Sequence, residues 1–301
     1  MADLRVTVAG VDFSNPLIAA SGTFGFGREY NEFYPLSTLG GISSKGITLK
    51  ERLGNPPPRS AEAPGCMLNA IGLQNPGVDY FIEHDLPWLK EQGTVVIANI
   101  AGNTPEEYCA MAEKLSDTNV DMLEMNISCP NVKEGGIAFG QDPRAVEEIT
   151  KRIKAVARQP VIMKLSPNVT DITEMARAAE AGGANALSLI NTLTGMKIDV
   201  QRQTFAIANK TGGLSGPAIK PVAVRMVYQV ANAVKLPIIG MGGIATAEDA
   251  LEFILAGATA VSVGTANFYR PTATVEIVEG IEAYMREKGI DDLKDLIGAV
   301  K

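Results

Sequence analysis

Short apolar runs recur along the chain, each followed by small or polar residues and then by a segment whose apolar positions have helical spacing. The runs are aliphatic and nearly continuous, a pattern typical of strands buried on both faces of a parallel sheet. We predict eight strands, at residues 17–20, 41–44, 95–98, 122–127, 161–165, 186–190, 238–241 and 260–263.

Amphipathic segments separate these predicted strands, and several open with a helix N-cap residue or a first-turn proline. We predict helices at residues 105–115, 143–157, 172–181, 221–234, 247–255 and 274–287. Alternating strands and helices indicate an α/β fold with a parallel sheet. Eight units favour a closed (β/α)8 TIM barrel over an open doubly wound sheet.

Two connections, residues 48–93 and 192–216, are too long to be plain turns. Loops of this length usually carry function or secondary structure of their own. The chain contains no evident linker, low-complexity tract or strong repeat. We therefore expect residues 1–301 to form a single domain, a barrel with long loop insertions at its C-terminal face.

The composition fits a globular enzyme, with 46% hydrophobic and 20% charged residues. The formal net charge of -7 argues against nucleic acid as a partner, because such binding rests on clustered Lys and Arg. The N-terminal residues lack the basic and apolar segments of a signal peptide, and no stretch reaches the ~18 apolar residues of a membrane span. We expect a cytoplasmic protein without membrane association.

Cysteine and histidine are scarce: Cys66, Cys109 and Cys129 form no CxxC pair, and His84 is the single histidine. An iron-sulfur cluster normally takes four thiolates, and a structural zinc site takes four ligands. We therefore expect no metal site and no disulfide framework in this chain. Cys66 and Cys109 are expected to be structural, and His84 to be a surface or hinge residue.

Polar or glycine residues end every predicted strand. Such residues often serve only as turn formers or solvated surface groups. Barrel enzymes, however, place their chemistry at the C-terminal ends of the strands, so eight such ends together favour a site there. The residues are Ser21, Lys45, Asn99, Asn126, Lys164, Asn191, Gly242, Gly243, Gly264 and Thr265.

Glycines follow the last two predicted strands, at Gly242, Gly243 and Gly264. Glycine lets backbone N–H groups approach an anion, and the loops after strands seven and eight form the phosphate site of many barrels. Together they predict a phosphorylated cofactor. Beside a flavin, the ammonium groups of Lys45 and Lys164 would stabilise negative charge that develops on the ring.

The hexapeptide NISCPN, at residues 126–131, places the thiol of Cys129 between two carboxamides. A cysteine beside a strand is often an inert small hydrophobe. Its position after the fourth predicted strand instead favours a base at the barrel mouth. The carboxamides of Asn69, Asn126, Asn131 and Asn191 could pair with a planar, amide-rich ring.

With these residues assembled, the chain closely resembles the class 1 dihydroorotate dehydrogenases, flavoenzymes of pyrimidine synthesis, over nearly its whole length. The SKGIT and VKEGG segments are most similar to subclass 1B, the catalytic subunit of a two-protein enzyme. The motifs that carry the resemblance are SGTFG at 21–25, SKGIT at 44–48, GNPPPR at 54–59, NAIGL at 69–73, NISCPN at 126–131 and VKEGGIAFG at 132–140.

The resemblance implies FMN at the barrel mouth, with dihydroorotate stacked on its ring. The positions that match flavin contacts of the family are Ser21, Lys45, Gly46, Asn99, Asn126, Lys164, Ile190, Gly216, Gly242, Gly243, Gly264 and Thr265. The positions that match substrate contacts are Lys45, Asn69, Ala70, Ile71, Gly72, Leu73, Asn126, Asn131, Asn191 and Thr192.

The resemblance also implies a mechanism in which dihydroorotate is oxidised to orotate. Cys129 removes the proton from C5, N5 of the flavin accepts the hydride from C6, and Lys45 and Lys164 stabilise the charge that develops. Residues 133–140, which include several glycines, are expected to form a lid that excludes water, with an ordinary surface loop as the alternative.

Electrons must then leave the flavin, and this chain lacks the cysteines for an iron-sulfur relay of its own. Subclass 1B implies a partner subunit with FAD and a [2Fe-2S] cluster, NAD+ as the terminal oxidant, and a heterotetramer of two chains of each kind. The alternatives are a class 1A homodimer that uses fumarate, a flavin-dependent tRNA-dihydrouridine synthase, and a non-catalytic phosphate-binding barrel. The acidic balance counts against the tRNA enzyme.

Overall fold

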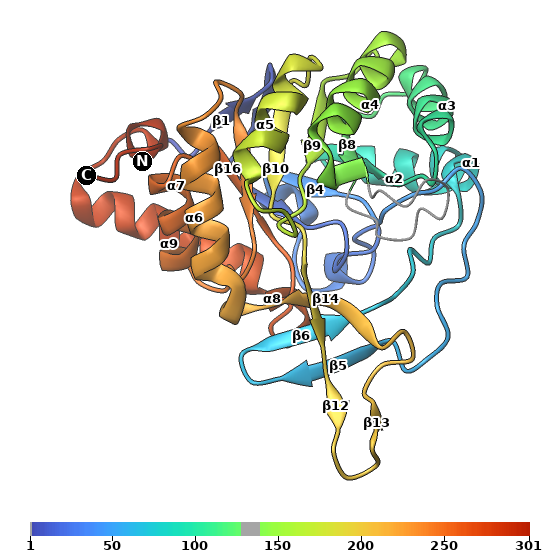
Figure 1. Ribbon diagram of the computed structural model, residues 1–301. Helices are drawn as coiled ribbons and strands as arrows, with labels where there is room; N and C mark the ends of the chain where they lie inside the picture. Colours follow the sequence, from blue (N-terminus) through green and yellow to red (C-terminus); the bar gives the residue numbers. More distant parts are fainter. Residues whose placement is uncertain (1, 128–138) are drawn as a thin grey trace.

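Eight parallel strands close into a barrel in the computed structural model, which describes residues 2–127 and 139–301 (Figure 1). Neighbours around the barrel follow the chain, and the last strand pairs with the first, so the predicted (β/α)8 barrel is confirmed. The strands are β3 (Leu17–Ala19), β4 (Gly41–Ser43), β7 (Val95–Ile100), β8 (Met122–Asn126), β9 (Val161–Lys164), β10 (Ala186–Leu189), β15 (Ile238–Met241) and β16 (Ala260–Val263).

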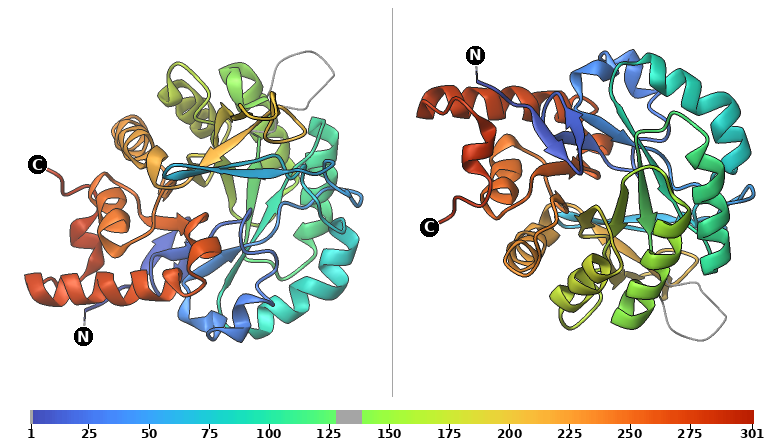
Figure 2. Two further views of the ribbon diagram at one scale, coloured as in Figure 1. Left: turned by 90° about the horizontal axis from the view of Figure 1, so that it is seen from below. Right: turned by 90° about the horizontal axis from the view of Figure 1, so that it is seen from above.

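Helices form a ring outside the barrel (Figure 2). All six predicted helices are present, with ends that shift by a few residues at most, whereas α2 and the π-helical turn before it, Phe81–Asp85, were not predicted. The longer helices are α2 (Leu86–Glu91), α3 (Pro105–Ser116), α4 (Pro143–Val156), α5 (Ile172–Ala181), α6 (Lys220–Ala231), α7 (Ala247–Leu255) and α9 (Ala273–Lys288). Shorter turns are α1 (Val78–Tyr80), α8 (Ala266–Tyr269) and the 3-10 segments Tyr30–Glu32, Leu36–Thr38, Phe139–Gln141, Pro217–Ile219 and Leu293–Leu296.

Side-chain caps fix where several of these helices begin. Thr104, Asp142 and Asp171 each accept a hydrogen bond from a backbone N–H in the first turn of α3, α4 and α5. Thr246 forms a reciprocal capping box with Asp249 at the start of α7. Each cap satisfies backbone donors that the helix itself leaves open, which sets the point where the chain turns from strand to helix.

Apolar side chains on both faces of the strands form the core. Ile42, Leu123, Ile162 and Leu187 are fully buried, and the strands β9, β10, β15 and β16 have no exposed residue. Complete burial of one such side chain stabilises the fold by about 1.5–3 kcal/mol. The near-continuous apolar runs of the sequence therefore correspond to the barrel strands, which are buried on one face by the barrel interior and on the other by the helices.

The two long connections build a second, four-stranded antiparallel sheet. The first supplies β5 (Ser60–Ala63) and β6 (Cys66–Asn69), the second supplies β11 (Leu193–Met196) and β14 (Thr211–Ser215), and β6 pairs with β14. The expectation that these loops have structure of their own is confirmed. The left view of Figure 2 looks onto this end of the barrel, with β5 and β6 in light blue crossing it.

Two hairpins complete the described structure. At the N-terminal end of the barrel, β1 (Val6–Val8) and β2 (Val11–Phe13) precede β3 and bury the ring of Phe13. At the opposite end, β12 (Ile198–Asp199) and β13 (Thr204–Phe205) extend from the four-stranded sheet as a projecting arm (Figure 1).

Candidate active site

A cavity of about 1080 Å³ lies at the C-terminal end of the barrel. The ends of the barrel strands line one side of it, and residues of β6, β11 and β14 line the other. The second sheet therefore covers the barrel mouth and encloses a space large enough for a ligand with a ring and a side chain, since ligand pockets commonly span about 300–1,000 Å³.

The structure brings together at this cavity every predicted site residue that lies in its described part. Cys129, Asn131 and residues 133–138 of the predicted lid lie outside the described residues, whereas Gly140 lines the cavity. The predicted residues at the cavity are Ser21, Lys45, Gly46, Asn69, Ala70, Ile71, Gly72, Leu73, Asn99, Asn126, Lys164, Ile190, Asn191, Thr192, Gly216, Gly242, Gly243, Gly264 and Thr265.

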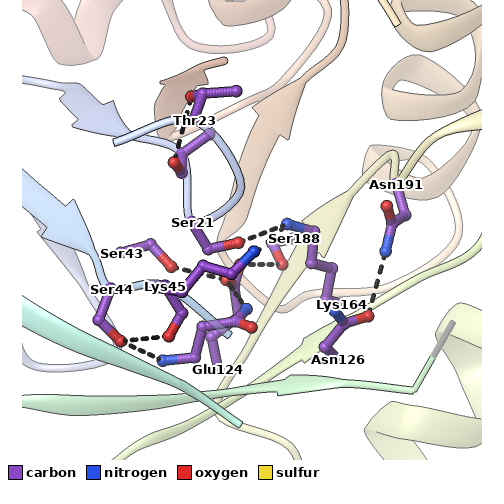
Figure 3. Close-up of polar contacts among 12 residues, drawn as sticks. Ser21, Thr23, Ser43, Ser44, Lys45, Glu124, Asn126, Lys164, Ser188 and Asn191 are labelled. Carbon is purple, nitrogen blue, oxygen red and sulfur yellow. Dashed lines mark hydrogen bonds and ion pairs between the residues drawn. The ribbon is translucent and has the colours of Figure 1, made fainter. Parts of the chain in front are cut away.

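A buried carboxylate, Glu124 of β8, organises the polar groups beneath the cavity (Figure 3). Its oxygens accept hydrogen bonds from Ser43 Oγ at 2.8 Å, Asn99 Nδ2 at 2.5 Å and Ser188 Oγ at 2.7 Å. Lys164 Nζ lies 3.9 Å from Glu124 Oε2 and 3.5 Å from Ser21 Oγ. Five strands, β4, β7, β8, β9 and β10, thus supply this group of contacts.

The surroundings shift the pKa of Glu124 and that of Lys45, which lines the cavity above it. Burial alone would raise the pKa of Glu124, but Lys164 and the hydrogen bonds from Ser188, Ser43 and Asn99 outweigh it and hold that pKa below its usual value. Burial lowers the pKa of Lys45, and the nearby cations Arg59 and Lys164 act in the same direction. Because Lys45 lines the cavity, an anionic ligand bound there would oppose this shift and favour its charged form.

Asn99 has an acceptor without a partner among the described residues. Its side chain is fully buried, Nδ2 donates to Glu124, and Oδ1 makes no hydrogen bond there. A Cβ added to the neighbouring Gly46 would lie 3.0 Å from this oxygen. Buried acceptors are normally paired, so Asn99 fits a ligand that presents an N–H group at the Gly46 edge of the cavity.

The edge of the cavity at the C-terminal ends of β15 and β16 fits an anion. Gly243 adopts a φ of +80°, and a Cβ there would lie 2.9 Å from both the Gly216 carbonyl oxygen and the Lys220 backbone nitrogen. Two backbone segments, residues 216–220 and the loop after β15, therefore meet here at a distance that only glycine permits. On the same edge, Thr265 Oγ1 lies 2.8 Å from Ser215 Oγ. The cavity glycines Gly242, Gly243 and Gly264 leave the backbone at this edge free of side chains, which suits a phosphate.

The opposite edge of the cavity is formed by the loop that contains Asn69–Leu73. Asn55 fixes this loop, because its Nδ2 donates to the Ala70 carbonyl at 2.9 Å and its backbone N–H donates to the Ile71 carbonyl at 2.9 Å. On the barrel side, Asn191 Nδ2 donates to Asn126 Oδ1 at 3.1 Å. These carboxamides face the same space and can bind a planar group with both donors and acceptors.

Reasoning from strand ends missed several residues of this site. Among them are Ser43, Glu124 and Ser188, which lie within strands, and Tyr108, which lies in α3. Cys66, which was expected to be structural, also lines the cavity, together with Asn55 and Ser215. The hydroxyl of Tyr108 donates to the Asn126 carbonyl at 2.6 Å and anchors the end of β8. A carboxylate inside an otherwise apolar strand was the available signal, because a buried Glu requires partners.

The model of the dihydroorotate dehydrogenase family matches residues 3–285. The chain belongs to the dihydroorotate dehydrogenase family. Two curated relatives are similar to it over nearly their whole length. A protein of Lachnoclostridium phytofermentans is 68% identical, and one of Alkaliphilus metalliredigens is 59% identical, each over 99% of both chains. Both relatives are named dihydroorotate dehydrogenase B (NAD(+)), catalytic subunit, so the resemblance inferred from the motifs is confirmed.

In the described part of the chain, no helix is both long enough and apolar enough to cross a membrane. Residues 2–127 and 139–301 also contain no group of three or more His, Cys, Asp or Glu side chains that could hold a metal ion.

Proposed function

We propose that this chain oxidises (S)-dihydroorotate to orotate, a step of UMP synthesis, with FMN as its cofactor. One observation carries the proposal: a single cavity joins an anion-binding glycine edge, two strand-end lysines and a set of carboxamides. A phosphorylated, amide-rich ring system and a small anionic heterocycle match those three features. Membership of the dihydroorotate dehydrogenase family supports the same substrate.

The residues of the cavity divide between the phosphate and the ring of FMN. Gly216, Gly242, Gly243, Gly264 and Thr265 would hold the phosphate at the glycine edge. Around the ring, Asn99 would accept from an N–H group through its unpartnered Oδ1, and the ring would be contacted by Ser21, Lys45, Gly46, Asn126, Lys164 and Ile190. When bound, FMN supplies a hydride acceptor that none of the protein side chains provides.

Dihydroorotate would lie between this ring and the loop that Asn55 fixes. Its ring N–H and C=O groups would pair with the carboxamides of Asn69, Asn126, Asn131 and Asn191, and the ammonium of Lys45 would pair with its carboxylate. The remaining contacts would come from Ala70, Ile71, Gly72, Leu73 and Thr192, which line the cavity beside those groups.

Cys129 is the proposed base, because it follows Asn126 of β8 by three residues and its segment therefore starts at the cavity. The substrate proton at C5 moves to the Cys129 sulfur while the carboxamides hold the substrate in place. A thiol with an ordinary pKa of about 8.5 is mostly protonated at neutral pH, so the rate should rise with pH as the thiol ionises. Lys45 and Lys164 would stabilise negative charge during the step.

Electrons are proposed to pass to a second subunit that carries FAD and a [2Fe-2S] cluster, and then to NAD+, in a heterotetramer of two chains of each kind. The names of the relatives support this, since they describe a catalytic subunit and NAD(+). We also propose that the enzyme works in the cytoplasm, where NAD+, the acceptor printed in these names, is available. The alternative acceptor is fumarate, used by a homodimer of this chain alone.

Steady-state assays with defined acceptors test this proposal. The purified chain should oxidise dihydroorotate with an artificial dye but use NAD+ only after addition of the FAD and iron-sulfur subunit. Efficient turnover of the chain alone with fumarate would assign the homodimeric alternative. No oxidation of dihydroorotate with any acceptor would contradict the proposed function itself.

A further inference from the structure

The carboxylate of Glu124 lies directly beneath the cavity and does not line it. Side chains alternate along a strand, so Glu124 shares the inner face of β8 with Asn126, which does line the cavity. Glu124 contacts two cavity residues, Asn99 at 2.5 Å and Lys164 at 3.9 Å. Any influence of Glu124 on a bound ligand therefore passes through these two side chains or through its charge.

The surroundings of Glu124 are those of an ionised carboxylate. Two hydroxyls and one amide N–H group donate to it, from Ser43, Ser188 and Asn99, and the ammonium of Lys164 is the nearest cation. Glu124 is only 3% exposed. An unpaired charge would be costly at this depth, but this set of donors and one cation compensates it.

The carboxylate determines which end of the Asn99 amide faces the cavity. An ionised carboxylate only accepts hydrogen bonds, so Asn99 must turn its NH2 group toward Glu124 and leave its oxygen at the Gly46 edge. The buried Oδ1 atom without a partner among the described residues is the result. Glu124 thus presents an acceptor, and not a donor, to whatever binds above it.

The carboxylate also balances the charge of Lys164. The two groups lie in the barrel interior, where charges are weakly screened. Without Glu124, the Lys164 ammonium would act on a ligand with its full field. With Glu124, part of that field is offset, so Lys164 stabilises negative charge on the ligand less strongly than it would alone.

We propose that Glu124 is a positioning residue that lowers the reduction potential of the flavin by offsetting the charge of Lys164 and by fixing Asn99 as an acceptor. The inference rests on the proposed function, because it requires FMN in this cavity. Reduction adds negative charge to the flavin ring, and a nearby anion together with an acceptor disfavours that charge. A lower potential helps electrons to move onward from this chain to a weak oxidant.

The substitution Glu124→Gln tests this inference because it removes the charge and keeps the shape. One oxygen of the glutamine amide can still accept from Ser43 and Asn99, and its NH2 group can donate to the Ser188 hydroxyl, which can rotate. We expect the variant to retain flavin and to favour its reduced form at least tenfold more than wild type does. That ratio corresponds to a rise of about 30 mV for a two-electron couple.

The measurement is an anaerobic reductive titration of the flavin-loaded chain against dyes of known potential. Lys164→Gln should lower the potential, and the double variant should return toward the wild-type value, because the two charges act as a pair. An unchanged or lower potential in Glu124→Gln would overturn the inference while leaving the proposed function intact. If the wild-type chain binds no flavin when FMN is supplied, both this inference and the proposed function are overturned.

A second variant keeps the test decisive if Glu124→Gln does not retain flavin. Ser188→Ala removes one hydroxyl dipole from Glu124 and leaves the carboxylate charge in place. The carboxylate then acts more strongly on the flavin, and the potential should fall. A rise, or no change, in Ser188→Ala would contradict the inference.

Discussion

Several side chains at the cavity are oriented by contacts with neighbouring residues inside the barrel. Asn99 and Lys164 meet Glu124, and Asn126 meets both Asn191 and Tyr108. These groups therefore have a defined orientation before a ligand enters. Such pre-orientation favours catalysis, because the energy needed to arrange the groups has been supplied by folding.

Replacement of Cys129 by serine should leave flavin binding intact and slow the oxidation of dihydroorotate at neutral pH by about 100-fold or more, since a hydroxyl is a much weaker base than a thiol. Stopped-flow mixing with dihydroorotate measures this step directly. In wild type, the rate should rise as the pH approaches about 8.5. Near-normal turnover of the serine variant at neutral pH would remove Cys129 from the role.

Acid should destabilise the fold partly through Glu124. Its folded-state pKa lies below the ordinary value of 4.5, so its stabilising effect is complete above that value and is lost as the pH falls through the folded-state pKa. In Glu124→Gln, the free energy of unfolding should fall less steeply below about pH 4.5 than in wild type. Urea unfolding of the two proteins without flavin measures the difference, and parallel pH dependences would refute it.

At the scale of elements, the loop over the cavity depends on Asn55. Asn55→Ala removes the hydrogen bond to the Ala70 carbonyl, which should loosen the Asn69–Leu73 segment without affecting the glycine edge. One such bond contributes about 1 kcal/mol, so we expect KM for dihydroorotate to rise about fivefold while flavin content stays constant. A variant with normal KM would show that the loop is held by other contacts.

The capping box of α7 gives a second prediction at this scale. Thr246→Ala should lower the free energy of unfolding by about 1 kcal/mol, because it removes the cap hydrogen bond to the Asp249 backbone. Thr272, which precedes α9, is a control, because its hydroxyl donates to the exposed Glu276 side chain and accepts from no backbone N–H of the helix. Denaturant unfolding should show a larger loss for Thr246→Ala than for Thr272→Ala, and equal losses would refute the assignment of the cap.

The barrel strands and six helices were predictable because each is a local pattern of apolar positions, and several of the helices open with an N-cap residue or a first-turn proline. The four-stranded sheet over the cavity was not, because β6 pairs with β14 across more than a hundred residues, and segments such as SAEA and TGGLS have weak strand preference. Glu124 was missed for a related reason. The strand-end criterion examined Asn126 and passed over the inward residue two positions before it.

At the scale of the whole molecule, the barrel supplies the lysines and glycines, and the two long connections supply the other wall of the cavity. Motif resemblance could predict many of the residues that line the cavity, whereas their enclosure by a second sheet required the structure. Folding of residues 1–301 as one domain stays a prediction. The binding roles of Ser21, Lys45, Asn99 and the other cavity residues are proposals that a loaded enzyme can test.

The visible spectrum of the freshly purified chain, recorded before and after anaerobic addition of dihydroorotate, tests the central claim most directly. The account predicts a flavin spectrum that bleaches on addition of substrate, with one orotate formed for each flavin reduced. A flavin spectrum that dihydroorotate leaves unchanged, or a chain that binds no flavin when FMN is supplied, would contradict it.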